Sequence, residues 1–233
     1  MLNTERPISD KQLAGCIDHT LLTATATEEQ IRQLCEDAKA YGFHCVCVNP
    51  RWVGFAADQL HGSKIKVCTV VSFPLGADST KSKVAAVHDA IMTGADEIDM
   101  VADLAAVMQG DSKYLTGQLH AVLKICRSMR PAVPLKVIIE SAALDTNQKI
   151  FVCQIAENCG VDFIKTSTGT HLVGGATIED IKLIRQIAPN CKIKASGGIK
   201  TAKQALEMLE AGAERIGTSH GVEIINQFRA GQI

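Results

Sequence analysis

Two kinds of hydrophobic pattern take turns along the chain. Short apolar or alternating runs predict β-strands, and longer stretches with apolar residues three or four positions apart predict α-helices. The expected strands lie at 17–20, 45–49, 66–73, 97–101, 135–140, 162–169, 192–195 and 215–218. The expected helices lie at 28–41, from Pro50 onward, 79–93, in a short segment from Asp103, and at 111–130, 147–158, 177–188, 201–211 and 222–228.

Eight strands, each followed by a helical segment, predict one fold. Within 233 residues, this order predicts a single-domain (β/α)8 barrel, the TIM-barrel fold, spanning residues 1–233. The alternative is a doubly wound open sheet. That fold would need a Gly-x-Gly-x-x-Gly segment after the first strand, and the sequence after 17–20 has none.

Composition excludes several classes of partner. The net charge is −1, with 24 Lys+Arg against 25 Asp+Glu, so no basic excess points to nucleic acid or to an anionic membrane. The first residues are polar and lack the apolar core of a signal peptide, and no apolar run approaches membrane-spanning length. These features predict a cytosolic protein.

The nine cysteines lie mostly inside apolar runs, which predicts buried reduced thiols. A zinc site built from His44, Cys45 and Cys47 is the alternative. Two thiols on one face of a strand lack the Cys-x-x-Cys spacing of a zinc knuckle, so we expect no metal site.

Charged residues recur on one phase of the expected strands. Barrel strands send alternate residues inward, and the aliphatic neighbours of these charged residues occupy the outward phase. The predicted interior set is Asp18, Asp99, Lys136, Glu140, Lys165 and Lys194. Unpaired buried charges are costly, so the set must be mutually paired. It is either a catalytic site at the barrel mouth or an ion-pair network that merely fills the interior.

Two of these lysines indicate the chemistry. Phe163, Lys165 and Ser167 share one strand face, and Lys194 lies on the next strand, so the two ammonium groups are expected to be neighbours. Like charges at close range drive one lysine toward the free amine, which can form a Schiff base with a carbonyl substrate. Asp99 could then move the proton that makes the enamine. The alternative for Lys165 is a strand-edge lysine that extends to water.

The last two expected strands lead into glycine-rich loops. Ser196, Gly197 and Gly198 follow the seventh strand, and residues 217–221 join the eighth strand to the last helix. In this fold such loops usually bind phosphate, because glycines let backbone N–H groups approach the anion. Ordinary glycine turns are the alternative reading.

An ordered set of segments resembles the deoxyribose-phosphate aldolases, a class I, Schiff-base family. The segments are DHTLL at 18–22, CVNP at 47–50, FPLG at 73–76, EIDMV at 97–101, KVIIE at 136–140, FIKTSTG at 163–169 and KASGG at 194–198. The resemblance covers nearly the whole chain. It implies cleavage of 2-deoxy-D-ribose 5-phosphate to D-glyceraldehyde 3-phosphate and acetaldehyde, without metal or organic cofactor, and it implies a homodimer.

The resemblance also implies roles for single residues. Lys165 matches the Schiff-base lysine, Lys194 the lysine that perturbs it, and Asp99 the proton donor and acceptor. Asp18, Thr20 and Lys136 match supporting positions, and Cys47 matches a thiol close to the substrate channel that the mechanism does not need. The expected phosphate-binding residues are Gly169, Gly197, Gly198, Ser219 and His220.

Three departures from the family pattern fall on the phosphate end. The loop after Gly169 is one residue longer, no lysine follows Gly169, and His220 stands where the family usually has a serine. Two other functions therefore stay open beside the main one. One is a Schiff-base aldolase with a different acceptor aldehyde, and the other is a phospho-sugar-binding barrel without turnover, against which the intact lysine pair argues.

Overall fold

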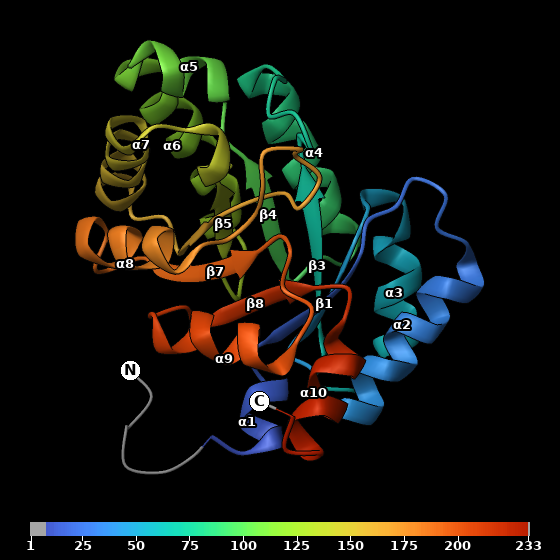
Figure 1. Ribbon diagram of the computed structural model, residues 1–233. Helices are drawn as coiled ribbons and strands as arrows, with labels where there is room; N and C mark the ends of the chain where they lie inside the picture. Colours follow the sequence, from blue (N-terminus) through green and yellow to red (C-terminus); the bar gives the residue numbers. More distant parts are fainter. Residues whose placement is uncertain (1–7, 233) are drawn as a thin grey trace.

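The computed structural model describes residues 8–232 and contains a closed barrel of eight parallel strands (Figure 1). The strands are β1 (Ile17–Leu21), β2 (Cys45–Val48), β3 (Lys66–Val71), β4 (Glu97–Val101), β5 (Leu135–Ile138), β6 (Phe163–Lys165), β7 (Lys192–Ser196) and β8 (Arg215–Thr218). Each strand pairs with the next, and β8 pairs with β1 through Ile17 opposite Ile216. The predicted (β/α)8 barrel is confirmed, and the open-sheet alternative is wrong because the sheet has no free edge.

Helices cover the outside of the barrel in Figure 1. They are α1 (Asp10–Ala14), α2 (Glu28–Tyr41), η1 (Pro50–Trp52) with α3 (Val53–Leu60), α4 (Thr80–Thr93), α5 (Leu104–Gln109), α6 (Ser112–Ser128), η2 (Ser141–Ala143), α7 (Thr146–Cys159), α8 (Ile178–Ile187), α9 (Ala202–Glu210) and α10 (Gly221–Arg229). Most expected elements match to within two residues at each end.

Helix termini follow the capping residues in the sequence. Thr27 accepts a hydrogen bond from the backbone N–H of Gln30, and Gly42 ends α2 in the left-handed conformation at φ 73°. The sequence pattern did not predict α1, whose five residues are too few to show helical periodicity. Strand β6 is also shorter than expected, since its pairing stops at Lys165 and the hydroxyl-rich continuation is a loop.

Alternation sorts the strand residues into two environments. Outward residues such as Ile98, Met100 and Val137 join one large cluster with the apolar faces of the helices. Inside the barrel, a smaller apolar cluster holds Cys45, Cys47, Cys68 and Val70, and charged side chains fill the rest. Because the strands are parallel, their carboxyl ends share one rim, where the loops can build a site.

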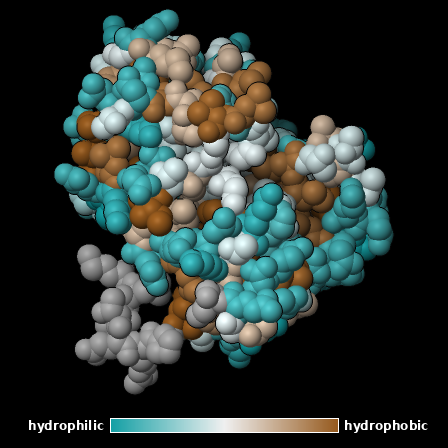
Figure 2. Space-filling view, in the orientation of Figure 1, coloured by the Kyte–Doolittle hydropathy of each residue, from teal (hydrophilic) through white to brown (hydrophobic). Residues whose placement is uncertain are grey.

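The face of the molecule drawn in Figure 2 carries both polar and apolar areas. Figure 2 shows hydrophilic atoms over α9 and α10, and hydrophobic atoms gathered near the top, where Figure 1 draws the β6–α8 loop. Large side chains exposed on the molecule include Leu75, Leu172 and Val173. Within residues 8–232, every helix is too short or too polar to cross a membrane.

Candidate active site

The carboxylate of Asp99 lies at the centre of the barrel interior and binds three lysines. Its Oδ1 accepts a hydrogen bond from Lys136 at 2.8 Å, and its Oδ2 accepts one from Lys165 and one from Lys194, each also at 2.8 Å. The strand register explains this convergence. Asp99 pairs with Lys136 across β4 and β5, and Lys165 pairs with Lys194 across β6 and β7. The predicted lysine pair is therefore brought together on one oxygen atom.

A second layer of charge lies beneath Asp99, toward the amino ends of the strands. Lys194 contacts Oδ2 of Asp18 at 2.5 Å, and Lys136 contacts Oε2 of Glu97 at 2.6 Å. The guanidinium of Arg215 donates to Oδ1 of Asp18 at 2.7 Å and reaches Glu97 at 3.5 Å. It also lies over the ring of Phe163, 5.4 Å from the centroid, so one face of the cation packs on an aromatic surface. The structure thus brings Asp18, Lys136 and Lys194, which the sequence placed inside the barrel, into one network with Asp99.

Burial and pairing act in opposite directions on these groups. Burial would raise the pKa of Asp99, but the ammonium groups of Lys136, Lys165 and Lys194 hold it well below its usual range. Burial would lower the pKa values of Lys136 and Lys194, yet their carboxylate partners raise both well above the usual lysine value. Asp18 is also held ionised, with its pKa lowered by Lys194 and Arg215 against the effect of burial.

One lysine of the network opens onto a cavity. The cavity has a volume of about 450 Å³, lies at the carboxyl rim of the barrel, and is lined by Lys165. Among the described residues, Lys165 is the one member of the charged network in this lining, whereas Lys136 and Lys194 are fully buried. Thr20 lines the same cavity and donates its hydroxyl hydrogen to the backbone carbonyl of Asp18 at 2.8 Å.

The other end of the cavity is built from the loops predicted to bind phosphate. The sequence-predicted residues that line it are Gly169, Gly197, Gly198, Ser219 and His220. Their loops pack backbone against backbone, because a Cβ on Gly175 would lie 2.2 Å from the carbonyl oxygen of Gly197. No larger residue fits there. Gly197 also has φ 92°, a backbone conformation that favours glycine.

His220 lies at the start of α10 and faces this cavity with Ser219. Its Nδ1 is 3.1 Å from Oγ of Ser219, and its side chain makes no capping hydrogen bond to the helix. Lys200 lines the same end of the cavity and is exposed. The sequence analysis missed Lys200, although its place two residues after Gly198, in the loop after β7, was a usable signal.

Glu140 corrects one prediction. We expected its carboxylate inside the lysine network, but it accepts hydrogen bonds from the backbone N–H of Thr168 at 3.2 and 3.3 Å. The reason is local. Strand β5 ends at Ile138, and Glu140 has a left-handed backbone with φ 51°, so strand alternation no longer applies. Glu97 and Arg215 belong to the network instead, although the sequence analysis predicted neither of them there.

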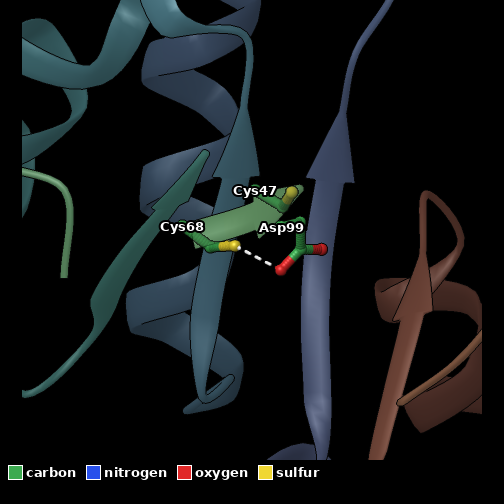
Figure 3. Close-up of side chains that lie close together, drawn as sticks. All are labelled: Cys47, Cys68 and Asp99. Atoms are coloured by element: carbon green, nitrogen blue, oxygen red, sulfur yellow. Dashed lines mark hydrogen bonds between the residues drawn. The ribbon is translucent and has the colours of Figure 1, made fainter. Parts of the chain in front are cut away.

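Three thiols occupy the remaining part of the interior. Figure 3 shows Cys68 beside Asp99, with its Sγ donating to Oδ1 at 3.1 Å, and Cys47 behind them. A hydrogen bond to Cys68 and burial raise the pKa of Cys47 well above its usual value, so this thiol is a weak nucleophile at neutral pH. Cys47 does not line the cavity; it lies within 4.8 Å of Cys68 and Asp99.

The grouping of Cys47, Cys68 and Asp99 also resembles a metal ligand set. However, both oxygens of Asp99 already face ammonium groups, and Lys136 lies 3.4 Å from the Sγ of Cys68. A divalent cation would meet three positive charges at this point, so the charge pattern disfavours a metal. The zinc set considered from the sequence does not form, because His44 instead contacts Glu97 at 3.1 Å.

Comparisons with known proteins identify the family of the chain. Residues 13–227 match the family model described as DeoC/LacD family aldolase. A deoxyribose-phosphate aldolase from Streptococcus equi subsp. zooepidemicus is 49% identical over 210 residues, which are 90% of this chain and 93% of the relative. One from Aciduliprofundum boonei is 49% identical over 216 residues, 92% of this chain and 96% of the relative.

Solved structures give the same result. A crystal structure of a putative deoxyribose-phosphate aldolase from Coccidioides immitis is 36% identical and superposes with a TM-score of 0.91, covering 95% of this chain and 87% of the other. The deoxyribose phosphate aldolase from Aeropyrum pernix, described as a unique tetramer, is 29% identical with a TM-score of 0.88, covering 95% and 93% of the two chains.

Proposed function

This chain belongs to the DeoC/LacD family of aldolases and is therefore a lyase, and on that premise we propose its reaction. The substrate is 2-deoxy-D-ribose 5-phosphate, and the products are D-glyceraldehyde 3-phosphate and acetaldehyde. The reaction passes through a Schiff base on Lys165. The observation that carries the proposal is that Lys165 joins the buried charge network and also opens onto the cavity.

The environment of Lys165 suits a nucleophilic amine. Lys165 and Lys194 donate to the same oxygen of Asp99, so the two nitrogens compete for one counter-charge. Lys194 has a second carboxylate, Asp18, which keeps it protonated. Lys165 has Asp99 as its one carboxylate contact among the described residues, so Lys165 is the lysine that gives up its proton.

The bond changes follow from an amine and a carboxylate at these positions. The free amine of Lys165 adds to the aldehyde carbon C1 of the open-chain sugar, and loss of water gives an iminium ion. Removal of the proton from the C3 hydroxyl then breaks the C2–C3 bond, and the electron pair moves into the iminium to form an enamine. D-glyceraldehyde 3-phosphate leaves, the enamine is protonated at C2, and water releases acetaldehyde and the free lysine.

Asp99 is the group proposed to exchange protons with the reacting atoms, directly or through one water. Its low pKa keeps it an acceptor at rest. Lys136 holds the other oxygen of this carboxylate at 2.8 Å, so the side chain keeps its orientation while Lys165 changes charge. Asp18 contacts Lys194 from the side of the amino ends of the strands and holds that side chain in its orientation in the same way.

The phosphate of the substrate is proposed to bind at the glycine-lined end of the cavity. Backbone N–H groups of the Gly197 and Gly198 loop and of the start of α10 are suited to an anion. Lys200 supplies positive charge in place of the lysine that the sequence lacks after Gly169, and the ring of His220 can donate a hydrogen bond to the phosphate. The homodimer implied by the resemblance stays a prediction.

A trapping experiment tests the covalent step. Incubation with acetaldehyde and borohydride should add a two-carbon group to Lys165, identified by peptide mass spectrometry. Lys165→Met is the matched control, which should lose both the adduct and the retro-aldol activity measured by coupled reduction of the released aldehyde. An adduct on Lys194, or none on any lysine, would overturn the assignment. Activity on unphosphorylated deoxyribose equal to that on the phosphate ester would remove the proposed phosphate site.

A further inference from the structure

The buried network contains more positive than negative side chains. Within the described residues, three carboxylates face four cationic side chains in the barrel interior. The carboxylates are Asp18, Glu97 and Asp99, and the cations are Lys136, Lys165, Lys194 and Arg215. All seven are 7% exposed or less. A net charge enclosed in this dry interior is costly, so the network is most stable when one cation loses its proton.

The contacts decide which cation that is. Arg215 does not deprotonate in proteins, and it lies on both Asp18 and Glu97. Lys136 holds Glu97 and Asp99, and Lys194 holds Asp18 and Asp99. Lys165, with Asp99 alone, has the fewest carboxylate partners and is the one lysine of this network that lines the cavity.

We propose that Arg215 is a positioning residue for the aldolase reaction: its permanent charge engages Asp18 and Glu97, and this leaves Lys165 as the group that releases a proton. The inference rests on Lys165 being the Schiff-base lysine, as proposed above. Arg215 acts at a distance, because its guanidinium contacts the carboxylates that hold Lys136 and Lys194 and is absent from the cavity lining. Removing its charge would balance the network with all three lysines protonated, and the nucleophile would then be lost at neutral pH.

Other titratable groups border the network or the cavity. They are His44 just before β2, Cys45 and Cys47 on β2, Cys68 on β3, Glu140 after β5, and Lys200 and His220 at the rim. Burial and hydrogen bonds to Cys68 hold the pKa values of Cys45 and Cys47 well above their usual range, so these two thiols are neutral. Cys68 is the one that could change the balance. Burial would raise the pKa of this thiol, but hydrogen bonds with Cys45 and Cys47 and the charge of Lys136 lower it to about 5. Its Sγ nevertheless lies 3.1 Å from Oδ1 of Asp99, a distance at which two anions repel each other unless a proton lies between them, so Cys68 counts as a neutral thiol.

The test measures how trapping of Lys165 depends on pH. Parent protein and Arg215→Met are incubated with acetaldehyde and cyanoborohydride between pH 5.5 and 9.5, and the adduct on Lys165 is quantified by mass spectrometry. Methionine keeps the apolar contact with Phe163 while removing the charge. The acidic limb of the profile should move about one unit to higher pH in Arg215→Met, a roughly tenfold loss of trapping on that limb. If Arg215→Met folds and the acidic limb of its trapping profile lies at the same pH as in the parent protein, the inference is wrong.

Three further variants make the result specific to charge. Arg215→Lys keeps the charge and should keep the limb in place; a limb shifted as in Arg215→Met would mean that the guanidinium geometry is what matters and would overturn the charge argument. Glu97→Gln removes a negative charge from the network and should move the acidic limb to lower pH. If Arg215→Met does not fold, Glu97→Gln is the variant that tests the inference, and an acidic limb at the same pH as in the parent overturns it. Cys68→Ala should leave the limb in place, whereas a shift to lower pH would show that Cys68 carries the balancing charge and would overturn the count.

The two proposals can fail separately. If parent protein forms no adduct on Lys165 at any pH, the Schiff-base assignment fails and the role of Arg215 falls with it. If the adduct forms on Lys165 with the same pH profile in parent and Arg215→Met, the Schiff base stands and the role of Arg215 alone is wrong.

Discussion

A lysine that the proposed reaction does not use is buried in the helix layer. Lys83 of α4 is completely buried, and its Nζ donates to the backbone carbonyl of Val101 at 2.8 Å and to Oε1 of Gln118 at 2.9 Å. Neither partner carries a charge. Burial lowers the pKa of Lys83 from 10.5 to about 8, with partial opposition from Asp103 and Asp78.

This shift makes stability depend on pH in a defined window. The unfolded chain keeps Lys83 protonated up to about 10.5, whereas the folded protein releases the proton near 8. Between these values the unfolded state binds more protons, so the stability of the fold rises with pH. Below pH 8 the folded protein carries the full cost of the buried ammonium, and above 10.5 that cost is absent. The difference between the two pKa values corresponds to about 3 kcal/mol.

The assay compares parent protein with Lys83→Met by urea unfolding at pH 7, 8, 9 and 10. Methionine fills the site and does not titrate, so all other ionisations cancel in the difference between the two proteins. The parent should gain stability relative to Lys83→Met as pH rises through the window, approaching the full 3 kcal/mol near its upper end. Gln118→Glu would place a carboxylate on Lys83 and should abolish the gain. A constant difference between parent and Lys83→Met from pH 7 to 10 would refute this account of Lys83.

Three further predictions concern the site itself. Lys194→Leu leaves Asp99 to pair with Lys165, so the amine stays protonated and retro-aldol turnover at neutral pH should fall by orders of magnitude while circular dichroism is unchanged; near-normal turnover would contradict this. Asp99→Asn leaves Lys136, Lys165 and Lys194 without their shared carboxylate, so it should abolish activity and also cost about 3–5 kcal/mol of unfolding free energy, which urea titration would measure. His220→Ala removes a ring N–H from the phosphate end of the cavity and should raise apparent KM for the phosphorylated substrate while sparing cleavage of unphosphorylated deoxyribose; an unchanged KM would remove His220 from the phosphate site.

Period-two alternation was enough to predict the centre of the site. It placed Asp99, Lys165 and Lys194 on the inward phase of their strands, and in the structure both lysines contact Asp99 and pair in register across β6 and β7. The same rule could have found two more residues. Glu97 is two positions before Asp99, and Arg215 is two positions before Gly217, where a Cβ would lie 2.9 Å from Cε of Lys194. Each starts its strand, where an inward residue lies at the lower end of the barrel.

Other features could not be read from alternation, because they arise where strands end. Glu140 leaves the inward phase through a left-handed backbone that no sequence period encodes. The helical periodicity, by contrast, does indicate that Lys83 is buried, because Lys83 shares the buried face of α4 with Val87 and Ala90. A lysine four and seven residues before buried apolar positions is unusual enough to predict a buried amine.

The position of Lys165 between the network and the cavity connects the fold to the chemistry. TIM-barrel interiors are usually filled by layers of branched aliphatic side chains, but here ion pairs and thiols fill much of the space under the site. Such a filling is tolerated only while nearly every charge has a partner. Lys165 is the exception, because it is 3% exposed and shares its single carboxylate with two other lysines. A side chain at that boundary is dry enough to be uncharged and open enough to meet an aldehyde, and these are the two properties that a Schiff-base lysine needs.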